Sequence, residues 1–190
     1  VDSFFMNLHI TAVLSKNGFG TSVSLSDIRK RGGKISAGGK SNGVVPIAEL
    51  FFNTASTISQ GGNRRGAIAC YLDVEHGDFD ELCDLLLHHP DGKNIGWIIK
   101  DSFTERLKAK EKEACEIFNK ILYTKLVTGK GYLFFVDKAN RLRPEAYKVN
   151  NLDIKASNLC SEISLHSSEE YDFSCILSSL NLVHADKFLE

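Results

Sequence analysis

Three side chains near the carboxyl end of the chain have the types and spacing of a reactive group. Asn158, Cys160 and Glu162 are each separated by one residue, so if this stretch is a strand, alternation puts them on one face. A thiol, a carboxylate and an amide on one surface can abstract an atom from a bound molecule, remove a proton from it and orient it within a single small pocket. The alternative is a strand with one buried, inert cysteine, because a free cysteine usually belongs to the core.

The surroundings of these residues resemble a known family. Residues 158–163, followed by a second cysteine at Cys175 and by residues 179–182, resemble the active-site strands of the ribonucleotide reductase large subunit. Residues 59–67 are similar to that family's second specificity loop, and residues 73–79 to the strand exit that follows it. The resemblance covers only the middle part of the sequence that the family needs for its activity.

The resemblance implies a role for each of these side chains. Cys160 becomes a transient thiyl radical that takes the 3′ hydrogen of a ribonucleotide, and Glu162 is the base that removes the 3′-hydroxyl proton. Asn158 holds the ribose hydroxyls, because an amide both donates and accepts hydrogen bonds. Cys175 is one half of a redox-active disulfide whose partner is absent from the chain. The implied substrate-binding residues are Gly18, Asn158, Cys160 and Glu162.

A basic, glycine-rich stretch at residues 29–43 could approach a phosphate. It has five glycines in the twelve residues 32–43 and several Lys and Arg side chains. Backbone amides that no side chain covers can point at an anion, whose charge the cations neutralise. The alternative, which composition alone favours, is a solvated flexible loop. The P-loop order is absent, but the position resembles the family's first specificity loop.

Residues 59–66 combine an amide side chain, paired glycines and paired arginines. Such a loop could contact both a base edge and a phosphate; the alternative is a basic turn between a helix and a strand. The resemblance implies that both loops serve an effector, a deoxynucleoside triphosphate or ATP. The implied effector-binding residues are Asp2, Ser3, Arg29, Ser36, Ala37, Gln60, Arg64 and Arg65.

Composition limits the other classes of function. The 190 residues are 43% hydrophobic, which predicts one domain with a hydrophobic core. Their net charge of -1 argues against a protein that binds nucleic acid by neutralising its phosphates. The five cysteines have neither paired nor zinc-type spacing, so we expect no metal site and a reducing, cytoplasmic setting. No apolar run reaches the roughly 18 residues of a membrane span, so no membrane association is expected.

Alternating helical and strand periodicities predict an α/β protein with a parallel sheet. The first predicted helix ends at Gly18, and its apolar residues are Phe4, Phe5, Leu8, Ala12 and Val13. A second helix is predicted to begin at Pro46, a third to span 79–89, and a single long helix to span 103–127. The predicted strands are 19–25, 67–72, 94–99 and a buried one at 133–136. His76 is expected to be structural, and Glu75 stands where the family commonly has tryptophan.

The resemblance narrows this fold to part of the ten-stranded α/β barrel of radical nucleotide enzymes. Residues 1–190 would form a single partial catalytic-barrel domain, with effector loops at about 26–66 and catalytic strands at about 157–182. Leu159 indicates the class that takes its radical from a separate metal-containing small subunit, since the cobalamin-dependent class more typically has proline there. No cofactor is expected in this chain itself.

The leading hypothesis is a piece of a class I ribonucleoside-di(tri)phosphate reductase large subunit. The absence of Met at the start indicates a split or processed version, and the near deletion of an insertion that the family usually carries around residues 94–127 indicates a compact viral one. The chain would reduce ribonucleotides only together with the small subunit and the remaining large-subunit segments, as an oligomer, and would not turn over alone. One alternative is a non-catalytic nucleotide-binding remnant that regulates an intact reductase. Another is a plain α/β domain with coincidental motifs.

Overall fold

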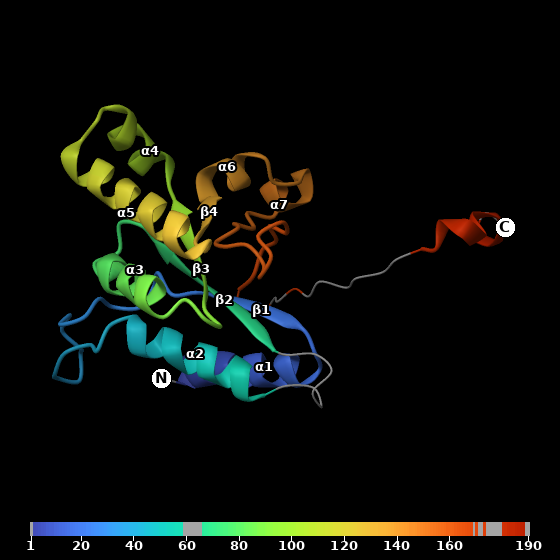
Figure 1. The fold of residues 1–190 in the computed structure, drawn as a ribbon, viewed down its shortest axis with the longest axis horizontal. Coiled ribbons are helices and arrows are strands. Elements are labelled where there is room, and N and C mark those ends of the chain that lie inside the picture. Colours follow the sequence, from blue (N-terminus) through green and yellow to red (C-terminus); the bar gives the residue numbers. More distant parts are fainter. Residues whose placement is uncertain (1, 59–65, 169, 171–172, 174–179, 189–190) are drawn as a thin grey trace.

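A four-stranded parallel sheet organises the protein. The computed structural model describes residues 2–58, 66–168, 170, 173 and 180–188. The strands β1 (Gly20–Ser24), β2 (Ala67–Asp73), β3 (Asn94–Ile99) and β4 (Tyr132–Phe135) lie in chain order across the sheet (Figure 1). Each strand is parallel to the next, in a register that pairs Tyr71 with Gly96 and Gly96 with Tyr132.

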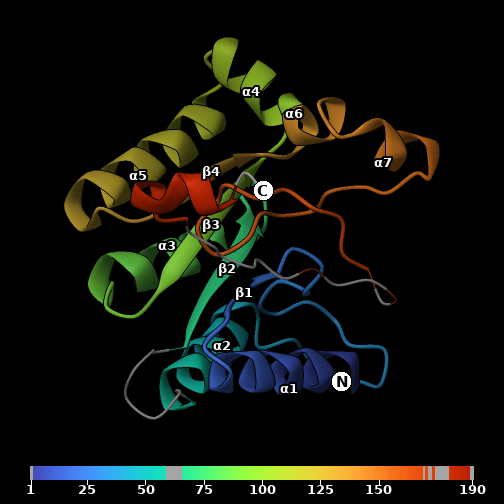
Figure 2. The same cartoon turned by 90° about the vertical axis from the view of Figure 1, so that its right-hand side faces the viewer.

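Helices precede, connect and follow these strands. They are α1 (Asp2–Lys16), α2 (Val45–Thr57), α3 (Phe79–His88), α4 (Asp101–Lys108), α5 (Lys112–Thr128), α6 (Val136–Arg141) and α7 (Glu145–Val149), followed by the 3-10 helix η1 (Leu182–Phe188). Figures 1 and 2 show α3 and α5 on one side of the sheet and the orange segment around α6 and α7 on the other. None of the described helices is long and apolar enough to cross a bilayer.

The sheet separates two apolar clusters. Along β2, Cys70 and Leu72 face the larger cluster, which the helices α2, α3 and α5 complete, together with Trp97 of β3. Ala69 and Tyr71 face the smaller cluster on the opposite side. Burial on both faces explains why β2 and β3 read as continuous apolar runs, as strands of parallel sheets do.

Most of the predicted elements are confirmed. The structure has the helices expected before Gly18, from Pro46 and over 79–89, and the strands expected at 19–25, 67–72 and 94–99. Proline lies in the first turn of α2, where its missing N–H costs nothing. The predicted buried strand at 133–136 is only partly confirmed, because β4 is an edge strand in which Phe134 is buried but Phe135 is exposed, and Val136 begins α6.

The single helix predicted over 103–127 is also wrong. The chain breaks between α4 and α5, where Lys110 has φ +57. Arg106 of α4 binds Glu111 (2.8 Å from Nε) and Glu113 (2.7 Å), on the far side of the break, and also Glu75. This pairing gives a physical reason for a glutamate at 75, since the carboxylate helps to hold the corner between the two helices.

Candidate active site

The residues 157–163 form a turn, so the strand predicted there is wrong. Asn158 N–H donates to the Ile163 carbonyl (3.0 Å), and Ser161 N–H donates to the Asn158 carbonyl (3.2 Å). Ser161 adopts φ +70. The Asn158 side chain is the local cause, because its Oδ1 accepts the N–H groups of Glu162 and Ile163, each at 3.1 Å. Such side-chain bonds compete with a strand ladder for the same backbone groups.

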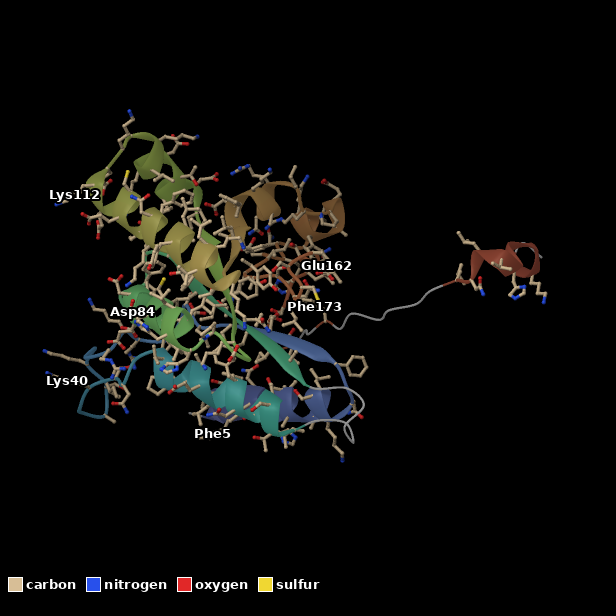
Figure 3. All side chains as sticks on the ribbon, viewed as in Figure 1. Phe5, Lys40, Asp84, Lys112, Glu162 and Phe173 are labelled. Atoms are coloured by element: carbon tan, nitrogen blue, oxygen red, sulfur yellow. The ribbon has the colours of Figure 1, made fainter. Side chains whose placement is uncertain are left out.

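The turn still brings two of the three candidate catalytic side chains together. Asn158 Nδ2 donates to Glu162 Oε1 at 3.0 Å. Asn158 is buried, whereas Cys160 and Glu162 are exposed. In Figure 3 Glu162 lies on the side of the sheet opposite Asp84 of α3 and Lys112 of α5. The turn therefore presents a thiol and an oriented carboxylate to the space beside the sheet.

The sheet supports this turn through several contacts. Ser22 Oγ of β1 donates to the Ser157 carbonyl at 2.8 Å. Tyr71 of β2 makes two hydrogen bonds of 2.9 Å, to the Asn158 carbonyl and to Ser161 Oγ. Leu159 packs so closely on Gly20 that a Cβ there would lie 2.6 Å from its Cδ2.

Gly96 on β3 makes room for the Tyr71 ring. A Cβ at Gly96 would lie 2.1 Å from Tyr71 Cε1. Sequence reasoning missed both residues, although each carries a signal. A tyrosine within an apolar strand needs a partner for its hydroxyl, and a glycine within a strand often marks a close approach.

The other cysteines fall into two groups. Cys70 and Cys83 are fully buried, and burial raises the pKa of each thiol, so both belong to the core. Cys115 is only partly buried. Cys175 lies outside the described residues. Among the residues that the structure describes, no group of three or more His, Cys, Asp or Glu could hold a metal ion.

The basic stretch at 29–43 is a loop held at its two stems. Asp78 is buried, and its carboxylate accepts the N–H of Arg31 (2.8 Å) and of Val44 (2.9 Å). His76 Nδ1 accepts the Asp78 N–H (3.1 Å), so Nε2 carries the proton and donates to the Ile28 carbonyl at 2.7 Å. The expected structural role of His76 is therefore confirmed.

The candidate effector residues of this loop are accessible. Arg29, Ser36 and Ala37 are exposed, as is Ser3 in the first turn of α1. Figures 1 and 2 both show the amino end of α1 on the side from which the loop projects, and Figure 3 places Lys40 of the loop far from Glu162. Gln60, Arg64 and Arg65 lie outside the described residues, as does the side chain of Asp2.

Gly18 is the remaining candidate substrate-binding residue. It ends α1 with φ +79, a left-handed conformation that favours glycine. It lies two residues before Gly20, against which Leu159 packs. Among the residues that the structure describes, β1 is what connects Gly18 to the turn.

The structure is thus an α/β domain that holds an exposed cysteine and an oriented glutamate beside a parallel sheet. The family described as "Ribonucleotide reductase, barrel domain" matches residues 1–114 and 99–188. The chain belongs to this family, and its sheet is part of the family's α/β barrel.

The relatives are ribonucleoside-diphosphate reductases or their large subunits. A putative ribonucleoside-diphosphate reductase large subunit of Frog virus 3 is 33% identical over 175 residues, covering 80% of this chain and 30% of that protein. The ribonucleoside-diphosphate reductase large subunit of Arabidopsis thaliana is 29% identical, covering 96% and 28%. A vitamin B12-dependent ribonucleoside-diphosphate reductase of Mycobacterium tuberculosis is 30% identical, covering 96% and 28%.

A solved structure agrees with these relatives. The Actinobacillus ureae class Id ribonucleotide reductase alpha subunit superposes with a TM-score of 0.82 at 37% identity, over 97% of this chain and 34% of that one. The chain therefore spans about a third or less of the proteins that it matches.

Proposed function

We propose that this chain is a catalytic-barrel segment of a ribonucleotide reductase large subunit and that it carries the reacting residues. The observation that carries the proposal is the turn in which Asn158 holds the Glu162 carboxylate at 3.0 Å while Cys160 lies exposed between them. The rest of the subunit would come from the segments that its relatives contain beyond this stretch.

The chemistry assigns one task to each residue. Cys160, as a thiyl radical, takes the 3′ hydrogen of a ribonucleoside di- or triphosphate, and Glu162 accepts the 3′-hydroxyl proton. Asn158 orients the carboxylate and the ribose hydroxyls. Cys175 and a second cysteine would supply the two electrons of the reduction by forming a disulfide. The radical would come from the metal cofactor of a separate small subunit, for which Leu159 and the likeness to a class Id subunit are the support.

The exposed basic loop would bind the effector, a deoxynucleoside triphosphate or ATP. Its support is the exposure of Arg29, Ser36 and Ala37, in a loop that projects on the same side as the amino end of α1 (Figure 2). With Asp2, Ser3, Gln60, Arg64 and Arg65 they make the full proposed effector set. Under this proposal, regulation and chemistry would use different parts of the molecule.

We also expect the assembled enzyme to be an oligomer in the cytoplasm. Of the apolar residues predicted for the first helix, Phe5 and Val13 are exposed rather than buried, and Met6 and Ile10 join them. A contiguous apolar face of this kind is typical of protein interfaces.

The test replaces single residues in a reductase assembled from this segment, the remaining large-subunit segments and the small subunit. Cys160→Ser should abolish deoxynucleotide formation, because a serine O–H is far harder to convert to a radical than a thiol. Glu162→Gln should keep nucleotide binding and slow turnover by roughly 100-fold, a typical loss for a general base. Cys115→Ser is the matched control.

Cys175→Ser should differ from all three variants. Hydrogen abstraction can still begin, but reduction stalls and the nucleotide decomposes, releasing free base. One assay that follows deoxynucleotide and free base separates the roles. Wild-type product formation by Cys160→Ser would refute the proposed function.

A further inference from the structure

The hydroxyl of Tyr71 joins β2 to both sides of the cysteine-bearing turn. The side chain is fully buried on the face of the sheet that carries the smaller apolar cluster, and its ring lies 6.1 Å from that of Phe134 in an edge-to-face arrangement. Its oxygen lies 2.9 Å from the Asn158 carbonyl and 2.9 Å from Ser161 Oγ. These partners are 87 and 90 residues away in the sequence.

The direction of both hydrogen bonds follows from the groups involved. A carbonyl oxygen can only accept, so Tyr71 donates its single proton to Asn158. The Ser161 hydroxyl must then donate to the Tyr71 oxygen. Burial raises the pKa of the Tyr71 phenol, which keeps the proton in place over the working pH range.

The two contacts flank Cys160 closely. Asn158 precedes it by two residues and Ser161 follows it directly. Ser161 has φ +70, a conformation that costs a non-glycine residue free energy and persists when the surroundings hold it. The hydrogen bond to Ser161 Oγ is such a restraint, so Tyr71 ties the Asn158 backbone before the thiol and the Ser161 side chain after it to the sheet.

We propose that Tyr71 is a positioning residue for the reaction, holding the turn so that the Cys160 sulfur and the Glu162 carboxylate address the same substrate. The inference rests on the proposed function and deepens it. Tyr71 does not touch the nucleotide; it acts through the turn. Ser161 is its partner in this role.

The test uses Tyr71→Phe, which removes only the hydroxyl, in the assembled reductase. Tyr123→Phe, on an exposed tyrosine of α5, is the matched control. Amide hydrogen exchange of residues 158–163 should become at least about tenfold faster, while exchange of β3 should be unchanged. The kcat should fall about tenfold or more with KM nearly unchanged, because misplacing a reacting group by about 1 Å can cost 100-fold.

A second variant isolates the coupling. Ser161→Ala should produce a smaller change in the same direction, and the Tyr71→Phe/Ser161→Ala double variant should be no slower than Tyr71→Phe alone. If Tyr71→Phe also loosens β3, Ser161→Ala decides, since Ser161 lies outside the core. Unchanged exchange of the turn, or faster exchange with an unchanged kcat, would overturn the inference. Product formation by Cys160→Ser would instead overturn the proposed function and leave the exchange result standing.

Discussion

The turn that carries Cys160 and the basic loop at residues 29–43 are held in different ways. The turn is hydrogen-bonded along its length, to itself through Asn158 and to the sheet through Ser22 and Tyr71. Within the described chain, the buried Asp78 bridges the two stems of the loop, and backbone hydrogen bonds such as Gly32 to Ser41 and Ile35 to Gly39 join the loop to itself. At the tip of the loop, a Cβ added at Gly38 or Gly39 would meet no atom within 4 Å.

This difference matches two demands. A group that must meet one reacting atom gains from a fixed position, because misplacement raises the barrier. A loop that must adapt to different effectors gains from a tip with open space around it, provided that its stems stay in place. The turn and the loop should therefore respond differently to substitution.

The largest effect is expected from Gly96→Ala, beneath the turn. The new Cβ would lie 2.1 Å from Cε1 of the Tyr71 ring, so the ring or the strand must move. We expect a loss of about 3 kcal/mol in the free energy of unfolding, at the upper end for overpacking, measured by urea denaturation. Gly39→Ala, at the open tip of the loop, should cost only about 1 kcal/mol because of its positive φ. Equal losses would break the comparison.

A smaller effect is expected from Asp78→Asn, at the stems of the loop. The amide keeps the shape but replaces the charged acceptor of the Arg31 and Val44 N–H groups. The free energy of unfolding should fall by about 2 kcal/mol, as for a buried hydrogen bond to a charge. Amide exchange at Arg31 and Val44 should speed up, and that of 158–163 should not.

Asp84→Asn is the control for this prediction, since Asp84 is a half-exposed carboxylate of α3, the helix that follows Asp78, and it pairs with Lys120. It should change stability by less than about 1 kcal/mol. If amide exchange at Arg31 and Val44 is unchanged in Asp78→Asn as well as in the control, Asp78 does not hold the stems of the loop.

The smallest effect on the fold is expected from Arg29→Ala, because this exposed side chain lies outside both core clusters. Its removal should leave stability unchanged and weaken binding of a deoxynucleoside triphosphate effector about tenfold, a typical value for one charge-assisted contact. Calorimetric titration of the assembled reductase measures this change. The control is Lys112→Ala, which changes an exposed lysine of α5 and should leave the affinity for the effector at the wild-type value. Equal affinity of the wild type, Arg29→Ala and Lys112→Ala would show that the loop is not part of the effector site.

The sequence alone determined the elements whose cause is local. Helical and strand periodicity, Pro46 in the first turn of α2 and Gly18 at the end of α1 depend on neighbours within a few residues. The motif with Asn158, Cys160 and Glu162 indicated the family, which the comparisons confirm.

Only the tertiary structure decided how that motif is built. Alternation predicted a strand, but Asn158 binds the backbone ahead of it, and Tyr71, 87 residues away, holds its carbonyl. Asp78 likewise reaches Arg31 across 47 residues, and Arg106 joins Glu75 at the corner where the expected single helix breaks. Contacts over such separations depend on how the strands are ordered in space, so no local pattern contains them.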